Sequence, residues 1–296
     1  MSKKRRGRAP GRYEKRSQAK EVWIQFRRNK GAMIGLVIII LMIIGTIVAN
    51  LVLDFDEQVA GPNILERLKS PNGDHIMGTD ELGRDLATRI IYGARYSFVI
   101  GFSAVFIAVI IGVPLGAFAG FYGGKWGELI MRVTDILAAV PSMLMAVVIV
   151  SALGHDTINL VIAIGICTIP ELVRITRAAV LMVRDQEYVE SARMVGMKDV
   201  EIIFEHVLPN CLSPILVQIA LRTASSIITA SALSYLGFGV QMPNPEWGAM
   251  LSAARNYLRN YSYMCLFPGL AIMVTVLSLN LIGDGLRDAM DPKLRR

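Results

Sequence analysis

Apolar residues fill the chain in long uninterrupted runs, and polar residues gather between them. Runs without Asp, Glu, Lys or Arg cover residues 31–53, 96–124, 136–154 and 260–283. At about 1.5 Å of rise per residue, a helix over each run can cross roughly 30 Å of hydrocarbon. Because these positions are continuously apolar rather than alternating, the runs predict spanning helices and not the strands of a barrel.

Two further segments are weaker candidates. Residues 157–179 are polar only near their second end, and residues 212–236 are interrupted by Arg222. Counting both, the sequence predicts an all-α, polytopic membrane protein with six transmembrane helices. The expected spans are about 32–53, 97–120, 131–153, 157–179, 212–236 and 263–283, with an outer loop over 54–96.

Composition agrees with a membrane protein. The chain is 53% hydrophobic and 19% charged, with a mean hydropathy of +0.48. These values lie outside the usual range of soluble globular domains.

The distribution of Lys and Arg predicts the orientation. The first 30 residues hold 12 of the 31 basic residues, so we expect a cytoplasmic N-terminal arm with an interfacial helix over 1–30. Six spans then return the C-terminus to the cytoplasmic side, and residues 31–296 form the membrane domain. This topology gives 23 basic residues inside and seven outside. Anionic lipid is therefore the expected partner of the arm, and nucleic acid is not. The first apolar run is too long for a cleaved signal peptide and should stay as an anchor.

The second span contains a row of small residues at every fourth position. Such rows let membrane helices approach closely. We expect this one to pack against a neighbouring helix, with Gly112, Gly116 and Gly120 at its centre. The full row is Ala104, Ala108, Gly112, Gly116, Gly120 and Gly124.

The fifth span is different because hydroxyl side chains surround much of it. Arg222 lies about ten residues inside, where a cation costs roughly 2.5–3.5 kcal/mol near the centre of the bilayer. One interpretation is a helix that lines an aqueous translocation path, with Arg222 facing the path or a nearby carboxylate. The other is that Arg222 extends to the cytoplasmic headgroups. The residues assigned to the path are Arg222, Ser225, Ser226 and Thr229.

The outer loop contains the stretch GTDELGRD over 78–85. We expect a helix from about Asp80, capped by Thr79 or Asp80 and supported by an Asp85–Arg89 pair at i, i+4. Its apolar stripe would comprise Leu82, Leu86 and Ile90. Such a helix could lie on the outer membrane surface or contact an external partner.

The loop over 184–210 is the least apolar part of the second half of the chain. Its first stripe should stop at Gly196, a candidate left-handed helix end, and Asp199 can cap the helix that follows. That second helix should end at Pro209. The expected buried stripes are Val189, Ala192 and Val195, then Val200, Ile203, Phe204, Val207 and Leu208. They would leave a polar knob with Ser191 and Ala192 at its tip, suited to a groove in another protein.

Chemical motifs of enzymes are missing from the sequence. The three cysteines and three histidines are scattered, and HExxH and GxSxG do not occur. The segment GGKW at 123–126 lacks the other residues of a phosphate loop. We therefore predict no catalytic residues, no metal site and no ATP bound by this chain. Asp135 is taken as the only acidic residue near a span, which argues against a secondary transporter driven by ion gradients.

Several stretches resemble the permease subunits of bacterial ABC importers. Glu190, Ser191, Ala192, Gly196 and the Leu-Pro at 208–209 are similar to the EAA loop, with Ser191 in place of an alanine and His206 in place of an isoleucine. GTDELGRD at 78–85 and FPGLAIMVTVLSLNLIGDGLRDAMDPKL at 267–294 resemble the C-type permease of dipeptide, oligopeptide and nickel importers. The resemblance runs from about Arg27 to the end.

This resemblance implies a type I ABC importer permease fold in the bacterial inner membrane. It also implies a homologous B-type permease, two cytoplasmic ATPase subunits that bind ATP and Mg²⁺, and an extracytoplasmic substrate-binding protein. The substrate stays open among dipeptides, oligopeptides, glutathione-like compounds and nickel chelates. The residues implied to dock the ATPase are Glu187, Glu190, Ser191, Ala192, Arg193, Gly196, Met197, Lys198 and Asp199.

Overall fold

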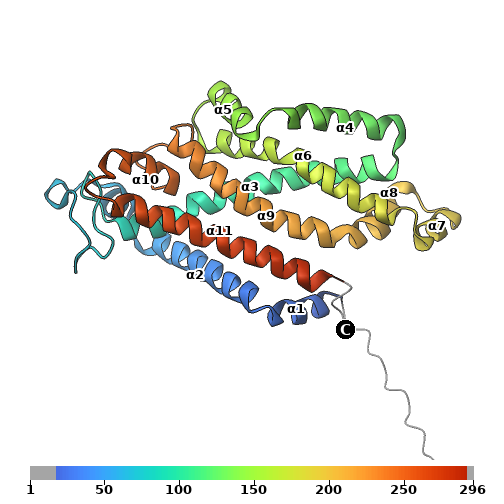
Figure 1. Ribbon diagram of the computed structural model, residues 1–296, viewed down its shortest axis with the longest axis horizontal. Helices are drawn as coiled ribbons and strands as arrows, with labels where there is room; N and C mark the ends of the chain where they lie inside the picture. The colour runs from blue at the N-terminus through green and yellow to red at the C-terminus, as the bar shows by residue number, and fades with distance from the viewer. Residues whose placement is uncertain (1–17, 292–296) are drawn as a thin grey trace, which may run out of the picture.

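The computed structural model describes residues 18–291, and helices dominate this part of the chain (Figure 1). The helices are α1 (Gln18–Arg28), α2 (Lys30–Val52), α3 (Leu86–Phe121), α4 (Gly124–Ala139), α5 (Ser142–Leu153), α6 (Thr157–Val183), α7 (Glu187–Met194), α8 (Asp199–Ile202), α9 (Leu208–Tyr235), α10 (Trp247–Ala254) and α11 (Tyr263–Met290). Shorter helical turns lie at Phe55–Ala60, Ile64–Glu66, Ile203–Val207 and Arg255–Tyr257.

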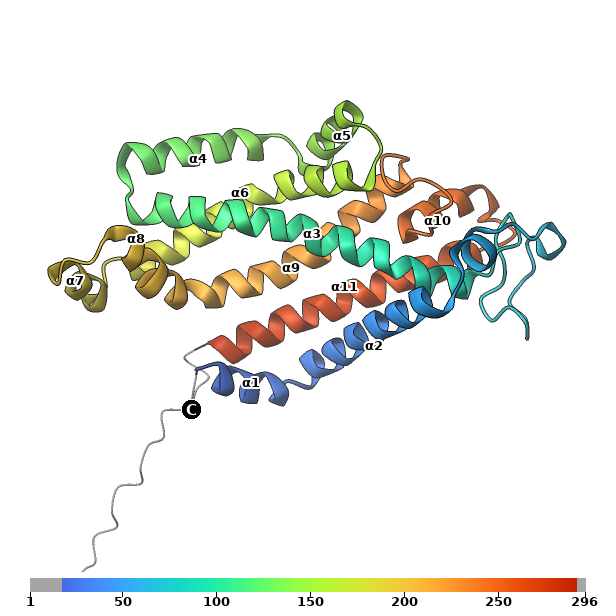
Figure 2. The same cartoon turned by 180° about the vertical axis from the view of Figure 1, so that it is seen from behind.

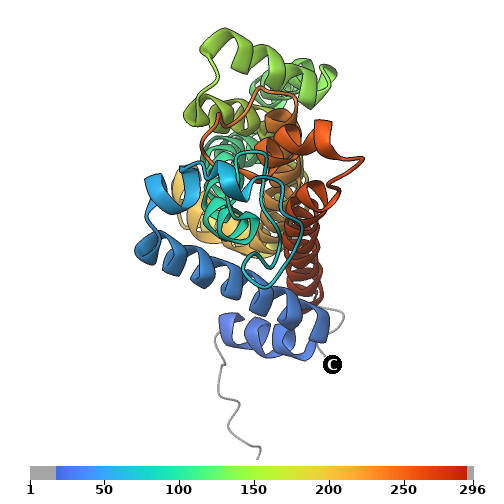
Figure 3. The same ribbon diagram turned by 90° about the vertical axis from the view of Figure 1, so that its left-hand side faces the viewer.

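The long helices run along one axis, and the connecting segments separate to its two ends. α7 lies at one end, while α10 and the loop between α2 and α3 lie at the other (Figures 1 and 2). Seen end-on, α3 occupies the middle, with α4 and α5 on one side and α1 and α2 on the other (Figure 3). Among the described residues, five helices are long and apolar enough to cross a membrane, or six spans if a bent pair counts as one.

That bent pair corrects one predicted span. The continuous helix expected over 131–153 is instead α4 and α5, which meet at an angle of 86°. Val140 is extended, with φ −89° and ψ 131°, and Pro141 follows it. Proline disfavours helical geometry in the preceding residue and offers no N–H of its own, so the helix breaks here.

The fifth span begins earlier than expected, and Pro209 does not end a helix. Pro209 lies in the first turn of α9, where a missing N–H costs no intrahelical bond. Instead, α8, a π-helical turn and α9 form one continuous apolar helical segment over Asp199–Tyr235.

The row of small residues in α3 lies against α6. A Cβ added at Gly116 would stand 2.6 Å from the carbonyl oxygen of Val173. Added Cβ atoms at Gly112 and Gly120 would meet Leu172 at 3.0 Å and Val180 at 2.9 Å. Gly124 lies beyond the end of α3, at the start of α4, so the row stops at Gly120.

The helix in the outer loop also begins later than predicted. α3 starts at Leu86, and the Asp85 carboxylate caps it by accepting from Thr88 N at 2.8 Å. Asp80 instead accepts from the backbone N–H groups of Leu82 and Arg84, at 2.9 and 3.0 Å, which holds residues 80–84 in a turn. The expected Asp85–Arg89 pair is replaced by an Asp85–His75 contact of 2.8 Å.

At the N-terminus, residues 1–17 of the predicted basic arm lie outside the described residues. α1 follows and packs through Phe26 against Ala32 of α2 and Ala289 of α11. Its position at a membrane interface stays a prediction.

Candidate functional site

The break between α4 and α5 opens a cavity of about 270 Å³ against α6 and α9. Pro141 and Ser142 line it at the break, and polar side chains line it from the two long helices. The lining residues with ionisable or hydroxyl groups are Ser142, Thr168, Glu171, Arg174, Arg222, Ser225, Ser226 and Thr229. All four residues that the sequence assigned to a translocation path thus border one cavity.

Arg222 forms an ion pair with Glu171 across this cavity. Glu171 is 14 residues from the start of α6 and 12 from its end, and Arg222 is 14 and 13 residues from the ends of α9. Both charges therefore lie near mid-helix. The Gln218 amide is assigned the orientation that satisfies its hydrogen bonds, in which its oxygen accepts from Arg222 Nε at 2.6 Å and Nη2 at 3.1 Å. Of the two interpretations left open for Arg222, the ion pair agrees with the one in which it faces a nearby carboxylate, and that carboxylate is Glu171.

A second ion pair lies beside the first. Arg174, one helical turn after Glu171 on α6, donates to Asp135 Oδ1 of α4 at 2.7 Å. The four charged side chains expose between 31% and 60% of their surface. Because exposed charges are costly in lipid, this face of the chain cannot be turned toward hydrocarbon.

The sequence interpretation missed Glu171 and placed Arg174 on the cytoplasmic face. It was also wrong in taking Asp135 as the only acidic residue near a span. The available signal was the spacing Glu171-Leu-Val-Arg174, which puts opposite charges on one helix face. Only the packing of α6 against α9 shows that Glu171 meets Arg222.

Two of the three α9 hydroxyl groups that line the cavity, those of Ser225 and Thr229, already donate to backbone carbonyls. Ser225 Oγ donates to the Leu221 carbonyl at 3.2 Å, and Thr229 Oγ1 donates to the Ser225 carbonyl at 3.0 Å. Thr168 Oγ1 on α6 donates to the Ile164 carbonyl at 2.8 Å. These oxygens therefore present lone pairs to the cavity.

A different candidate site is the knob that α7 forms at the end of the molecule. α7 closes at Gly196, whose φ of +83° is left-handed. The N–H of Gly196 donates to the Arg193 carbonyl at 3.0 Å and that of Met197 to the Ala192 carbonyl at 3.2 Å. These two bonds are a Schellman motif, so the glycine end predicted from the sequence is confirmed.

The orientation of α7 differs from the sequence interpretation. Val189 and Ala192 are buried, so Ala192 is not at the tip, whereas Val195 is 81% exposed and Met194 is 82% exposed. Met197 is half-buried. The other residues assigned to ATPase docking are on the surface: Glu187, Glu190, Ser191, Arg193, Gly196, Lys198 and Asp199. Met194 and Val195, which the sequence interpretation did not assign to docking, give the knob an exposed apolar tip.

The segment after Gly196 differs from the sequence prediction in two respects. The residue that precedes the helix is Lys198, not Asp199, and Glu201 accepts from Lys198 N at 3.3 Å. Val200 and Phe204 are 50% and 54% exposed, while Ile202 and Val207 are fully buried. Phe204 lies within the π-helical turn at Ile203–Val207, whose wider period moves this side chain off the buried face.

Two arginines, Arg193 of α7 and Arg184 at the end of α6, contact the end of α3. The Arg193 guanidinium group lies over the Phe121 ring at 4.9 Å, within cation–π distance. Arg184 Nη1 donates to the Gly120 carbonyl at 3.0 Å. α7 is therefore held directly against the corner where α3 turns into α4.

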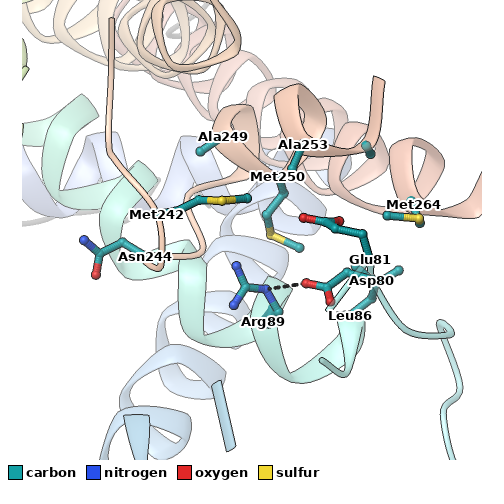
Figure 4. A pocket seen from close by; sticks show the side chains of 11 residues that line it. Asp80, Glu81, Leu86, Arg89, Met242, Asn244, Ala249, Met250, Ala253 and Met264 are labelled. Atoms are coloured by element: carbon teal, nitrogen blue, oxygen red, sulfur yellow. Dashed lines mark ion pairs between the residues drawn. The ribbon is translucent and has the colours of Figure 1, made fainter. Parts of the chain in front are cut away.

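The opposite end of the molecule is closed by a buried charge cluster. Arg89 donates to the carbonyls of Val59 and Pro243 and lies 3.5 Å from Asp80 Oδ2 (Figure 4). The space beside it, between Met242 and Met250, holds only about 10 Å³, close to the volume that one water needs. The space beside Arg89 is therefore too small for a solute, and the residues around it form a tightly packed cap.

Comparison with known proteins identifies the family. The family described as "binding-protein-dependent transport system inner membrane component" matches residues 112–296. A second family, the N-terminal transmembrane domain of oligopeptide transport permease C, matches residues 17–71.

Relatives that match this chain over nearly their full length are also permeases. The di/tripeptide transport system permease protein DppC of Pseudomonas aeruginosa is 46% identical over 94% of this chain and 93% of its own length. The glutathione transport system permease protein GsiD of Shigella flexneri is 45% identical over 93% of this chain and 90% of its own length.

Solved structures support the fold. An inward-facing MetNI methionine ABC transporter aligns with a TM-score of 0.58 at 14% identity, covering 69% of this chain and 97% of its own. An amino acid ABC transporter crystallised with histidines aligns with a TM-score of 0.53. The predicted all-α type I permease fold is thereby confirmed. The chain belongs to the family of binding-protein-dependent transport inner membrane components, in its oligopeptide permease C branch, and is a multi-pass permease subunit of an ABC importer.

Proposed function

We propose that this chain forms half of the translocation pore of an ATP-driven importer for peptides or a related small solute. The relatives named as di/tripeptide and glutathione permeases support this substrate class. The other half of the pore is a homologous B-type permease. Two cytoplasmic ATPase subunits bind ATP and Mg²⁺, and an extracytoplasmic binding protein delivers the solute.

One observation carries the pore assignment. Two ion pairs, Arg222–Glu171 and Arg174–Asp135, lie inside membrane helices around a cavity of about 270 Å³ and stay partly exposed. A face with such charges has to meet either water or another protein. A second permease subunit that covers this face would turn the cavity into a polar passage.

The proposed orientation in the membrane is supported by the charge of the N-terminal arm together with the separation of the connecting segments to two ends. The excess of Lys and Arg in the N-terminal arm assigns α1 and the C-terminal end to the cytoplasm. α7 lies toward that end and α10 toward the opposite one (Figure 1). In this orientation the α7 knob faces the ATPases and the buried Arg89 cap faces the binding protein.

The knob has the physical character of a docking element. Met194 and Val195 are exposed apolar side chains on a short helix whose last turn is fixed by the Gly196 hydrogen bonds. Exposed apolar anchors with a charged surround are typical of interface hot spots. ATP-driven closure of the ATPases would move the knob, and the contact of Arg193 with Phe121 would carry that movement to the end of α3.

Charge reversal of Glu190 tests the docking role. In the reconstituted importer with its binding protein, we expect Glu190→Lys to lose most uptake and most stimulation of ATP hydrolysis by loaded binding protein. Glu205→Lys is the matched control, because Glu205 is also exposed but lies outside α7. Unchanged stimulation in Glu190→Lys, with normal membrane insertion, would count against the proposed function.

A further inference from the structure

We propose that the cavity beside Arg222 binds a zwitterionic solute, with Arg222 holding its carboxylate and Glu171 its ammonium group. This inference rests on the proposed function, because it takes the cavity as part of the solute path. It goes further by assigning the charge class of the solute and the residue that recognises each of its ends.

The first argument is charge balance. The cavity is lined by Arg174, Arg222 and Glu171, and Asp135, which does not line it, is the ion-pair partner of Arg174. A solute with net charge would leave one charge uncompensated in a region of low dielectric constant, which is costly. A zwitterion adds no net charge, and its two ends can replace the partners that the protein charges lose.

The second argument is the arrangement around Arg222. Its guanidinium group has five N–H donors, and the Gln218 amide oxygen already accepts from Nε and Nη2. Gln218 can therefore keep Arg222 in place when Glu171 moves away. Entry of a zwitterion then exchanges the single Arg222–Glu171 pair for two pairs, and no charge is left alone.

The third argument concerns three of the hydroxyl groups that line the cavity. Ser225, Thr229 and Thr168 donate to carbonyls of their own helices, at 3.2, 3.0 and 2.8 Å. The lone pairs that remain can only accept. They complement an ammonium group or the N–H of a peptide bond, and they offer no donor to a second carboxylate.

The fourth argument is the polarity of the helix break. α4 ends and α5 begins at the cavity, on the two sides of Val140 and Pro141. The last turn of α4 presents carbonyl oxygens and the first turn of α5 presents N–H groups, each equivalent to roughly half a unit charge. A single break therefore supplies both signs of partial charge to one small space.

The volume sets an upper limit on the part of the solute that is held. Small-molecule sites usually measure about 300–1,000 Å³, and this cavity holds about 270 Å³ within one subunit. A dipeptide-sized zwitterion matches it better than an extended oligopeptide does.

The test measures protection of a cysteine in the cavity. Cys167, Cys211 and Cys265 are replaced by serine and Ser225 by cysteine, and the chain is assembled with its partner permease and ATPases. Leaving out the binding protein removes its own selectivity. A water-soluble thiol reagent should label Ser225→Cys, and alanyl-alanine should slow this labelling by about tenfold. A tenfold effect corresponds to about 1.4 kcal/mol of binding free energy. N-acetyl-alanyl-alanine and alanyl-alanine amide, which each lack one charge, should protect much less.

Two variants test which residue binds the carboxylate of the solute and which binds its ammonium group. Arg222→Gln should make the amide and the free dipeptide equal protectors, and Glu171→Gln should do the same for the acetylated form. The double variant Arg222→Gln/Glu171→Gln leaves no unpaired charge, so it assembles even if the single variants do not. It should still be labelled, without preference among the three compounds.

The test distinguishes failure of the zwitterion site from failure of the proposed pore. If Ser225→Cys is labelled but the three compounds protect equally, or not at all, the zwitterion site is wrong and the proposed pore stands. If Ser225→Cys reacts no faster than Ile228→Cys, an exposed position of α9 outside this cavity, the cavity is not on a water-filled path and both proposals fail.

Discussion

Arg222 and Glu171 lie near the midpoints of α9 and α6, where an unpaired charge would oppose insertion. Each has a partner of opposite sign, and the neighbouring Arg174 and Asp135 pair in the same way. Pairing lowers the cost of these charges but does not make them suitable for lipid, since they stay partly exposed. Single side chains thus decide which face of the chain has to be covered.

Glu246 is a buried carboxyl at the opposite end of the molecule, outside the spanning helices. Its Oε2 accepts from Ala249 N at 2.9 Å and its Oε1 accepts from Ser231 Oγ at 3.2 Å. Burial raises the pKa of Glu246 above its ordinary value of 4.5, and the hydrogen bonds offset this only in part. The folded state therefore prefers the neutral acid.

This preference gives a pH-dependent prediction. Below pH 4.5 the carboxyl is protonated both folded and unfolded, and its stabilising contribution is fully present. As pH rises toward the higher folded pKa, the unfolded state ionises first and stability is lost. We expect the Tm of Glu246→Gln, relative to the unaltered chain, to increase with pH over this interval in detergent. A constant difference in Tm would contradict the prediction, and Glu57→Gln, at an exposed site, is the control.

Breaks between helices shape both candidate sites. The break at Val140 and Pro141 opens the cavity, and the left-handed turn at Gly196 shapes the knob. Nothing lies within 4 Å of a Cβ added at Gly196, so the glycine is required by its backbone conformation and not by lack of space.

Substitution of Gly196 separates conformation from bulk. A non-glycine residue in the left-handed region costs about 1–2 kcal/mol, and asparagine tolerates it best. We expect Gly196→Val to lose most solute uptake and Gly196→Asn to retain most of it, at equal amounts of inserted protein. Equal loss in both variants would indicate that the knob needs a hydrogen atom at this position, and the conformational explanation would then be wrong.

The whole molecule is polarised along its long axis. The knob lies at one end and the Arg89 cap at the other (Figures 1 and 2). With α4 and α5 taken as one pass, six passes put the described ends of the chain on the same side.

Thiol labelling of intact cells tests this polarity. In a chain with its own three cysteines replaced, we expect a membrane-impermeant reagent to label Ser70→Cys, in the loop between α2 and α3. It should label Ser191→Cys on α7 only after the cells are opened. Both serines are exposed, so accessibility to solvent does not separate them. Labelling of Ser191→Cys in intact cells would reverse the proposed orientation and remove the knob from the ATPases.

Much of the fold could be predicted from hydropathy, because lipid leaves few ways to satisfy backbone hydrogen bonds. The span expected at 263–283 lies within α11, and the span expected at 32–53 extends one residue beyond the end of α2. Errors arose where side chains override the local pattern. The Asp80 carboxylate holds a turn where a helix was expected, and the π-helical turn after Ile202 moves the buried face away from Phe204.

The sequence by itself determined a multi-pass helical protein with a glycine-ended knob, because apolar run lengths and a left-handed glycine are local properties. Only the tertiary structure decided that Arg222 meets Glu171, since these residues are 51 positions apart and belong to different helices. It also decided that Met194 and Val195, rather than Ala192, form the tip of the knob. Which side of a helix is buried depends on what packs against it, and that information is not present in any single segment.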